Sequence, residues 1–369
     1  MTLARRAPGR VNLIGEHTDY NDGYVLPVAI DRFTTVEAAP RRDRRLMLRS
    51  TAYAEPADID LDAQAAGPTG SWTDYVRGVA AVLERTGCRL TGAELSIDST
   101  VPIGAGLGSS AALEVAAACA LLDVSGLALE PTAIARVCQQ AEREFAGTQC
   151  GVMDQFIACH GRAGCALLLD TRTLAMDWVP MPEGIEVVVC NTMTTHALAR
   201  DGYNERRAEC DEGTRVLASS APAIRALRDV SLEVLDASRD AMSDRVYRRC
   251  RHVVSENGRV LAASAALRAG DLSTMGRLMC ESHRSLRDDF DVSTRELDAM
   301  VEIALDADGV FGARLTGGGF GGCTVSLVRA DAVPAFVAHV AGAYAARTGT
   351  VPEIYRCLAS DGIAATPRS

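Results

Sequence analysis

Lysine is missing from this sequence, because all 38 basic residues among its 369 positions are arginines. A Walker A nucleotide-binding loop needs a lysine beside its Ser or Thr, a protein-kinase site needs a lysine on a strand, and a Schiff-base enzyme needs a lysine amine. These three kinds of active site are therefore excluded. An enzyme of this sequence that handles phosphate must use backbone amides, arginine and metal.

Several other features are absent or scarce. No two of the 12 cysteines form a CxxC pair and no HExxH motif occurs, so zinc-ribbon and thioredoxin-type sites are not indicated. The chain starts without a signal-peptide-like apolar stretch, and its longest uncharged apolar run, residues 115–122, is far shorter than the ~20 residues of a membrane span. A net charge of −10 does not suit nucleic acid or anionic lipid. We expect a cytosolic protein with reduced, mostly buried thiols and no nucleic-acid or membrane partner.

Length and hydrophobic pattern predict the organisation of the chain. A length of 369 residues fits about two domains at roughly 100–200 residues each. Strands are predicted at 11–14, 24–30, 33–39, 46–50, 93–98, 165–170, 185–190 and 322–328, and a loop over 54–71. Helices are predicted at 72–85, 110–123, 131–145, 200–218, 244–268, 271–287 and 293–306. This pattern predicts the α+β class, with one domain over residues 1–178 and another over 179–369.

The first segment that indicates chemistry is residues 104–110, Gly-Ala-Gly-Leu-Gly-Ser-Ser, which precedes a predicted helix. Glycines allow a tight turn that brings several N–H groups close to a ligand, and the helix N-terminus adds unpaired donors and a positive dipole end. Together they indicate an anion site, best suited to a polyphosphate, where a serine hydroxyl could reach a bound Mg²⁺. The alternative is a glycine-rich strand-to-helix turn with Ser109 or Ser110 as the N-cap.

A second glycine-rich segment, residues 317–322, reads Gly-Gly-Gly-Phe-Gly-Gly. Five glycines in six positions are too costly for the interior of a helix or strand. The segment therefore approaches a ligand, packs against another backbone such as the first glycine segment, or forms a flexible hairpin loop.

Polar side chains are concentrated at Glu16, His17, Thr18 and Asp19, directly after a strand predicted to be buried. Carboxylates of this kind bind polyhydroxyl ligands by accepting hydrogen bonds from hydroxyls. The alternatives are a Glu/His/Asp metal site, which lacks further ligands at useful spacing, and an Asx-rich turn between strands. Farther on, Asp154 lies in an uncharged stretch beside Met153 and Phe156, either as a functional acid or as a helix N-cap.

Taken together, these segments resemble the galactokinase family of the GHMP small-molecule kinase superfamily. Residues 10–26 are similar to that family's sugar-binding signature, residues 102–114 to the superfamily's phosphate-binding loop and helix, and residues 315–323 to its third motif. The resemblance extends over nearly the whole chain. It implies an N-terminal domain like ribosomal protein S5 domain 2, a C-terminal α+β domain, and an active site in the cleft between them.

The resemblance also implies roles for single residues. Arg10 matches the transition-state arginine and Asp154 the catalytic aspartate, while Ser110 and Glu142 match the Mg²⁺ positions. The residues that match the galactose-binding positions are Glu16, His17, Thr18, Asp19 and Tyr203. Those that match the ATP-binding positions are Trp72, Gly104, Ala105, Gly106, Leu107, Gly108, Ser109 and Ser110.

The activity that this resemblance implies is ATP-dependent phosphorylation of the anomeric hydroxyl of galactose, with Mg²⁺ as cofactor and galactose and ATP as the binding partners of an expected monomer. Two alternatives stay open. The first is a related sugar kinase acting on arabinose or N-acetylgalactosamine, and the second is a non-catalytic sensor that binds ATP and galactose.

Overall fold

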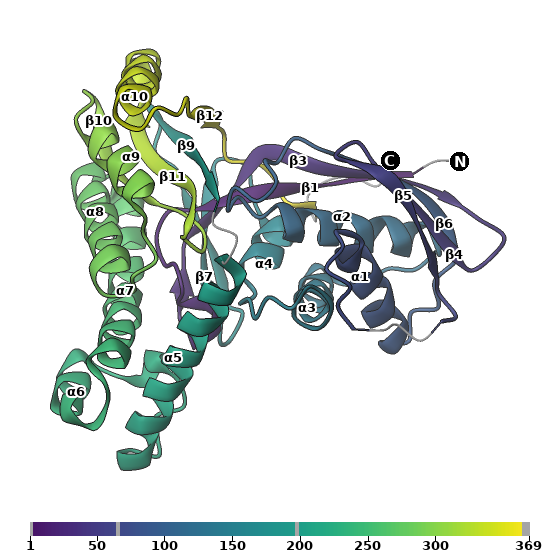
Figure 1. Cartoon of the computed structure of the whole chain (residues 1–369), viewed down its shortest axis with the longest axis horizontal. Helices are drawn as coiled ribbons and strands as arrows, with labels where there is room; N and C mark the ends of the chain where they lie inside the picture. Colours follow the sequence, from purple (N-terminus) through teal and green to yellow (C-terminus); the bar gives the residue numbers. More distant parts are fainter. Residues whose placement is uncertain (1–2, 64–66, 196–198, 364–369) are drawn as a thin grey trace.

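Two lobes make up the computed structural model, which describes residues 3–63, 67–195 and 199–363 (Figure 1). In the first lobe a sheet lies over a layer of helices, and in the second most helices surround a smaller sheet. This arrangement confirms the predicted α+β class. Within the described ranges, no helix has both the length and the apolar character needed to cross a membrane.

The sheet of the first lobe has the order β1-β3-β6-β4-β5, formed by β1 (Leu3–Asn12), β3 (Pro27–Pro40), β6 (Ala93–Ser99), β4 (Arg45–Ser50) and β5 (Tyr53–Asp60). Strands β4 and β6 pair in parallel, and the other neighbours are antiparallel. Buried and exposed residues alternate along β6, so one face of the sheet is packed and the other is solvated.

Helix α2 (Ser109–Val124) lies at the centre of the first lobe, against β1 and β3. Most of its residues are small and apolar, and it is buried on nearly all sides, as expected for a helix without a polar face. Its neighbours are α1 (Thr73–Arg85), α3 (Pro131–Ala141) and α4 (Met153–His160). The body of α2 is thus fixed by its neighbours, which holds its N-terminus in place.

The loop predicted over residues 54–71 is partly wrong. Its first part belongs to β5, which pairs with β4 at the edge of the sheet, while residues 64–66 lie outside the described ranges. Most of β5 is exposed, and Pro56 is tolerated because an edge strand needs no partner on its outer side. The first four residues of β5 are all exposed and show no alternation, and only the last four alternate, which is a short signal for a strand.

The second lobe is built on a sheet of order β10-β11-β9-β12, all antiparallel. Its strands are β9 (Ile185–Thr195), β10 (Val310–Leu315), β11 (Gly321–Arg329) and β12 (Glu353–Cys357). Its helices are α5 (Ala199–Ser220), α6 (Leu232–Ala237), α7 (Asp244–Ala269), α8 (Leu272–Asp288), α9 (Arg295–Leu305) and α10 (Val333–Thr348). The helices predicted from the sequence are confirmed with nearly the predicted ends. Elements α4, α6, α10, β8, β10 and β12 were not predicted.

The lobes share a core and a small third sheet. This sheet consists of β2 (Tyr24–Val25), β7 (Cys165–Asp170) and β8 (Met176–Pro180). One apolar cluster contains Val11 and Leu13 of the first lobe together with Val187 and Val325 of the second. The domain division predicted after residue 178 falls within β8, and we keep it as a proposal.

The chain also returns from the second lobe to the first after β12. Ala359 forms a bridge with Ile30 of β3, and the Ser360 amide donates to Ala29 O at 2.9 Å. The amide of Gly362 donates to the carbonyl oxygen of Gly161 at 2.8 Å. Residues 358–362 therefore cover the edge of β3 next to residues 29–31.

Candidate active site

Residues 104–108 form a tight turn between β6 and α2. Its three glycines have φ values between 72° and 75°, in the left-handed region that favours glycine. Between them, the side chains of Ala105 and Leu107 are buried in the core. The glycines therefore turn the backbone toward the cleft, while the other two residues fix the turn to the protein.

The alternative that Ser109 or Ser110 caps α2 is wrong. The N-cap is Gly108, and no side chain there accepts a hydrogen bond from the first turn. The first turn also holds no acidic residue. Because its amides are not used by a side-chain cap, this helix N-terminus is suited to an external anion.

The second glycine segment packs directly against the first. A Cβ added at Gly317 would lie 2.7 Å from the carbonyl oxygen of Gly106, and one at Gly322 would lie 2.8 Å from that of Ala105. Such distances exclude any side chain, so glycine is required at both positions. This confirms the packing against the first glycine segment, one of the alternatives that the sequence left open.

Arg10 and Asp154 form a two-pronged ion pair beside the first glycine segment. Arg10 Nε donates to Asp154 Oδ1 at 2.8 Å, and Nη2 donates to Oδ2. The backbone amide of Arg10 donates to Leu107 O at 2.9 Å, which ties β1 to the turn. Asp154 lies in the first turn of α4, whose N-cap is Val152, so the N-cap alternative for this aspartate is wrong.

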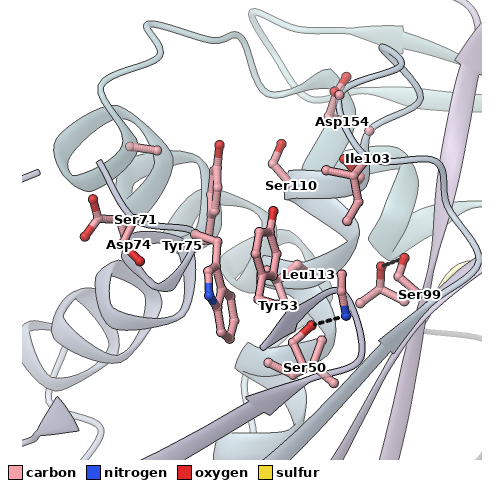
Figure 2. Close-up of a pocket in the computed structure, with 18 of the residues that line it drawn as sticks. Ser50, Tyr53, Ser71, Asp74, Tyr75, Ser99, Ile103, Ser110, Leu113 and Asp154 are labelled. Atoms are coloured by element: carbon pink, nitrogen blue, oxygen red, sulfur yellow. Dashed lines mark hydrogen bonds between the residues drawn. The ribbon is translucent and has the colours of Figure 1, made fainter. Parts of the chain in front are cut away.

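A first cavity of about 520 Å³, here cavity A, opens beside these residues. It is lined by glycines of residues 104–108, by Ser109 and Ser110, and by the Arg10–Asp154 pair. At its far end the Tyr53 and Trp72 rings stack with centroids 5.0 Å apart and an interplanar angle of 5°. Tyr53, Ser110 and Asp154 face the same space in Figure 2. An anion site joined to stacked aromatic rings suits a nucleotide.

A group of buried polar side chains lies below cavity A. Ser110 Oγ donates to Glu142 Oε1 at 3.1 Å, and Gln155 Nε2 donates to Glu142 and to Glu114 at 2.6 and 3.1 Å. Burial, then the Asp154 charge, raises the pKa of Glu142 to about 7. Burial and the Glu142 charge likewise raise the pKa of Glu114 well above its ordinary value. Burial and mutual repulsion therefore disfavour the charged forms of these carboxyl groups.

A smaller cavity of about 150 Å³, here cavity B, lies on the other side of the Arg10–Asp154 pair. Besides that pair, its lining residues are Glu16, His17, Asp19, Glu142, Thr148, Cys150, Gly151, Met153, Tyr203, Gly317 and Gly318. They come from both lobes, with Tyr203 supplied by α5. A small polar cavity with carboxylates, an imidazole and a phenol suits a polyhydroxyl ligand.

Asp19 is, beside Glu142, a carboxyl group of cavity B whose pKa is raised toward neutral pH. Burial, then the charge of Asp154, raises its pKa to about 6. Gly151 lies against it, because a Cβ there would be 1.9 Å from Asp19 Oδ2. The aspartate thus borders the cavity with a carboxylate whose charge changes close to pH 6.

Glu16 also borders cavity B, but its oxygens are engaged within the protein. Oε1 accepts from the Gly317 amide at 2.7 Å, and Oε2 accepts from Arg314 Nη1 at 3.0 Å. The side-chain amide of Asn12, through Nδ2, and the Thr316 hydroxyl also donate to this carboxylate. Glu16 therefore joins β1 to the second glycine segment.

The other two residues of the polar stretch differ in position. The backbone of His17 is in the left-handed region, with a φ of 64°. Its Nδ1 lies 2.8 Å from Tyr20 OH, while its Nε2 is buried and has no hydrogen-bond partner in the described part of the chain. Burial lowers its pKa well below the ordinary value, so the imidazole is neutral. Thr18 lies behind the cavity and donates to backbone carbonyls of Gly15 or Tyr24.

Sequence reasoning missed several residues of these cavities. Tyr53, which lines cavity A, was not singled out because it borders a segment predicted to be a loop. An aromatic residue near a predicted nucleotide site is nevertheless a usable signal. Gln155 and Glu114 were missed because only the fold brings them to Glu142. Gly317 and Gly318 belong to a segment that the sequence did single out, but without a place in the site.

Comparison with protein families gives three matches along the chain. The galactokinase galactose-binding signature matches residues 3–40, the GHMP kinases N terminal domain matches residues 74–162, and the GHMP kinases C terminal domain matches residues 263–346. These ranges include Arg10, the polar stretch, the first glycine segment, Asp154 and the second glycine segment.

Several known proteins are similar over nearly their whole length. The galactokinase of Roseiflexus sp. (strain RS-1) is 50% identical over 358 residues, which cover 97% of this chain and 91% of that protein. The galactokinase of Chloroflexus aggregans is 49% identical over 362 residues, or 98% and 93% of the two chains. The crystal structure of Lactococcus lactis galactokinase complexed with galactose has a TM-score of 0.93 at 35% identity, covering 98% and 94%. A mevalonate kinase structure, 19% identical with a TM-score of 0.66, shares the fold.

Proposed function

The chain belongs to the galactokinase family of the GHMP kinases, and on that premise we propose that it transfers the γ-phosphoryl group of ATP to the anomeric hydroxyl of galactose. One observation supports this most directly. The Arg10–Asp154 pair lines both cavity A, which suits a nucleotide, and cavity B, which suits a sugar. A pair at this junction lies on the path that a phosphoryl group would take from a nucleotide in cavity A to a sugar in cavity B.

The backbone of residues 104–108 and the N-terminus of α2 hold the phosphates of ATP. Tyr53 and Trp72 provide an apolar, stacked surface for the base. Arg10 is kept in place by Asp154 and by the Gly106 carbonyl, which accepts from Nη1. From there its guanidinium stabilises negative charge on the phosphoryl group in transit.

Asp154 receives the proton of the sugar hydroxyl. A carboxylate is a weak base for a free hydroxyl, but in a loose phosphoryl-transfer transition state the proton leaves late, when the oxygen is already bonding to phosphorus. The ion pair with Arg10 holds the Asp154 carboxyl group at the junction of the two cavities. Asp154 thus orients the nucleophile and accepts its proton.

The residues at Ser110 and Glu142 fit a Mg²⁺ ion. Both offer hard oxygen donors, and Mg²⁺ is usually bound by one or two carboxylates together with substrate phosphates and water. The raised pKa of Glu142 reflects buried negative charge that a divalent cation would neutralise. When bound, the ion would supply charge neutralisation for the phosphates.

Asp19→Asn should raise the KM for galactose about tenfold, because an ionised acceptor of sugar hydroxyls is replaced by a neutral amide. With a pKa of about 6, Asp19 is ionised above pH 6 and protonated below it. The wild-type KM for galactose should therefore rise as the pH falls through 6, while that of the variant should lack this rise near pH 6 and keep only the dependence due to Glu142. Steady-state kinetics between about pH 5 and pH 8 measure both curves.

A matched control is Asp177→Asn, because Asp177 is an exposed aspartate paired with Arg268 and lines neither cavity. Its KM for galactose should equal the wild-type value at each pH. A wild-type KM that does not change between pH 5 and pH 8 would exclude Asp19 as the ionising sugar ligand.

The proposed activity is tested by ADP release with a panel of aldoses. Galactose should support far faster ADP release than glucose, since the two sugars differ only at C4 and a site with buried polar groups rejects the wrong epimer. A higher kcat/KM for arabinose or N-acetylgalactosamine would instead identify a related sugar kinase. Binding of ATP and galactose without ADP release would identify a non-catalytic sensor.

A further inference from the structure

A third cavity of about 300 Å³ lies behind cavity B, and we call it the arginine pocket. It is open to solvent and is bordered by the 3-10 helix η1 (Asp19–Asn21), by α3, by the π-helix η2 (Glu142–Ala146), by the turn after β7 and by α5. Four guanidinium groups border it, those of Arg136, Arg143, Arg172 and Arg207. The function described above uses none of them.

The lining of the arginine pocket has an excess of positive charge. Only two carboxylates, those of Asp19 and Asp22, border it together with the four guanidinium groups. Asp22 already pairs with Arg172, whose Nε lies 3.1 Å from Oδ2. Asp19 also lines cavity B, so its side chain borders both cavities.

One guanidinium nitrogen at this pocket is buried without a hydrogen-bond partner within the described ranges. Arg172 Nη2 is buried without a hydrogen bond, although Nη1 donates to Asp229 at 2.7 Å. Arg143 donates to Cys150 O from Nε at 2.7 Å and also from Nη2, and Arg207 donates from Nη1 to Gln149 O at 2.7 Å. These backbone contacts hold both guanidinium groups beside the pocket.

We propose that the arginine pocket binds the phosphoryl group of a small phosphorylated metabolite. Guanidinium groups bind phosphate oxygens through paired, charge-assisted hydrogen bonds, and a site with four of them favours a dianion over a monoanion. A volume of about 300 Å³ is at the lower end of small-molecule cavities, which leaves room for a metabolite larger than the phosphate alone. The site is separate from the glycine segment that holds the phosphates of ATP.

Occupancy of the arginine pocket should weaken galactose binding through Asp19. The positive charge of Arg143 favours the ionised form of Asp19. A dianion bound among the arginines would offset the positive charge of Arg143 and place negative charge beside Asp19, which disfavours the ionised form of that aspartate. This coupling rests on the proposed sugar site, whereas the anion site rests on its own lining residues.

Calorimetric titration tests the site directly. Wild-type protein saturated with galactose and a non-hydrolysable ATP analogue is titrated with inorganic phosphate, with glucose 6-phosphate, and with glucose as the uncharged control. We expect saturable binding of glucose 6-phosphate, weaker binding of inorganic phosphate and none of glucose. The double variant Arg136→Gln/Arg207→Gln should bind glucose 6-phosphate at least ~10-fold more weakly, because it lacks two charged partners.

The matched control is Arg215→Gln, which removes an exposed arginine of α5 that does not border the arginine pocket. This variant should bind like the wild type, and all three proteins should have the same kcat without added phosphate. Equal affinity of the double variant and the wild type, or no saturable binding to the wild type, would overturn the proposal. Inorganic phosphate binding as tightly as glucose 6-phosphate would also overturn it, because the ligand would then be the free ion.

The coupling is measured separately, as the KM for galactose with and without glucose 6-phosphate. Glucose 6-phosphate should raise this KM about two- to fivefold in the wild type and leave it constant in the double variant. A chain that does not phosphorylate galactose would fail this assay and still pass the calorimetric one. The two proposals can therefore fail independently.

Discussion

Asp154→Asn is expected to lower kcat at least ~10²-fold, or about 2.7 kcal/mol of transition-state stabilisation, while the KM values for galactose and ATP change little. Asparagine keeps the shape of the side chain but cannot take up the proton of the sugar hydroxyl. It also leaves Arg10 without its charged partner, so the guanidinium that serves the phosphoryl group is held less firmly. Both effects slow the phosphoryl-transfer step itself. They do not remove a group on which the binding of galactose or ATP depends, so the KM values change little.

A matched control exists in the first lobe. Asp123 pairs with Arg5 at 2.5 Å in a similarly buried ion pair that lines neither cavity A nor cavity B. Asp123→Asn should lower stability but leave kcat unchanged. If Asp154→Asn kept near-wild-type turnover, with contaminating kinase excluded, the role of Asp154 would be structural only.

The second large effect concerns stability. Glu16→Ala should lower the free energy of unfolding by about 3–5 kcal/mol, because breaking a buried ion pair leaves an unpaired charge in the core. Glu16 is 2% exposed and Arg314 is 0% exposed. The substitution also removes the acceptor of the Gly317 amide, so the second glycine segment loses its link to β1. Urea denaturation of the variant and the wild type measures the difference.

The exposed pair of Glu281 and Arg277 on α8 serves as the control. Glu281→Ala should cost less than about 1 kcal/mol, as is typical for surface ion pairs. An unchanged free energy of unfolding for Glu16→Ala, combined with a raised KM for galactose, would contradict the structural role. Glu16 would then act mainly as a sugar ligand.

Local signals in the sequence predicted the parts of the site that lie on continuous segments. Alternating glycines before a helix predicted the turn at residues 104–108, and five glycines in six positions predicted close backbone packing at residues 317–322. In both cases the cause is steric and acts within a few residues. The polar stretch at residues 16–19 was likewise visible in the sequence, since carboxylate, imidazole and hydroxyl side chains stand next to one another there.

Long-range partners were not visible in the sequence. Glu16 and Arg314 are 298 positions apart, and Arg10 and Asp154 are 144 apart, so no local pattern connects them. The resemblance to a known family proposed a role for Arg10 and Asp154, but it assigned Glu16 to the sugar and said nothing of Arg314. Tyr53 was missed for a different reason, because the residues at its end of the edge strand are all exposed and show no recognisable period.

The return of residues 358–362 to β3 affects how the protein is made. A chain is synthesised from its N-terminus at ~5–20 residues per second, so these residues follow residue 178 by roughly ten to forty seconds. During that time the ribosome carries a first lobe whose β3 lacks the bridge at Ile30 and the hydrogen bond at Ala29. An unpaired strand edge is a template for association with other chains. The first lobe is therefore most exposed to misassembly while the second lobe is still being translated.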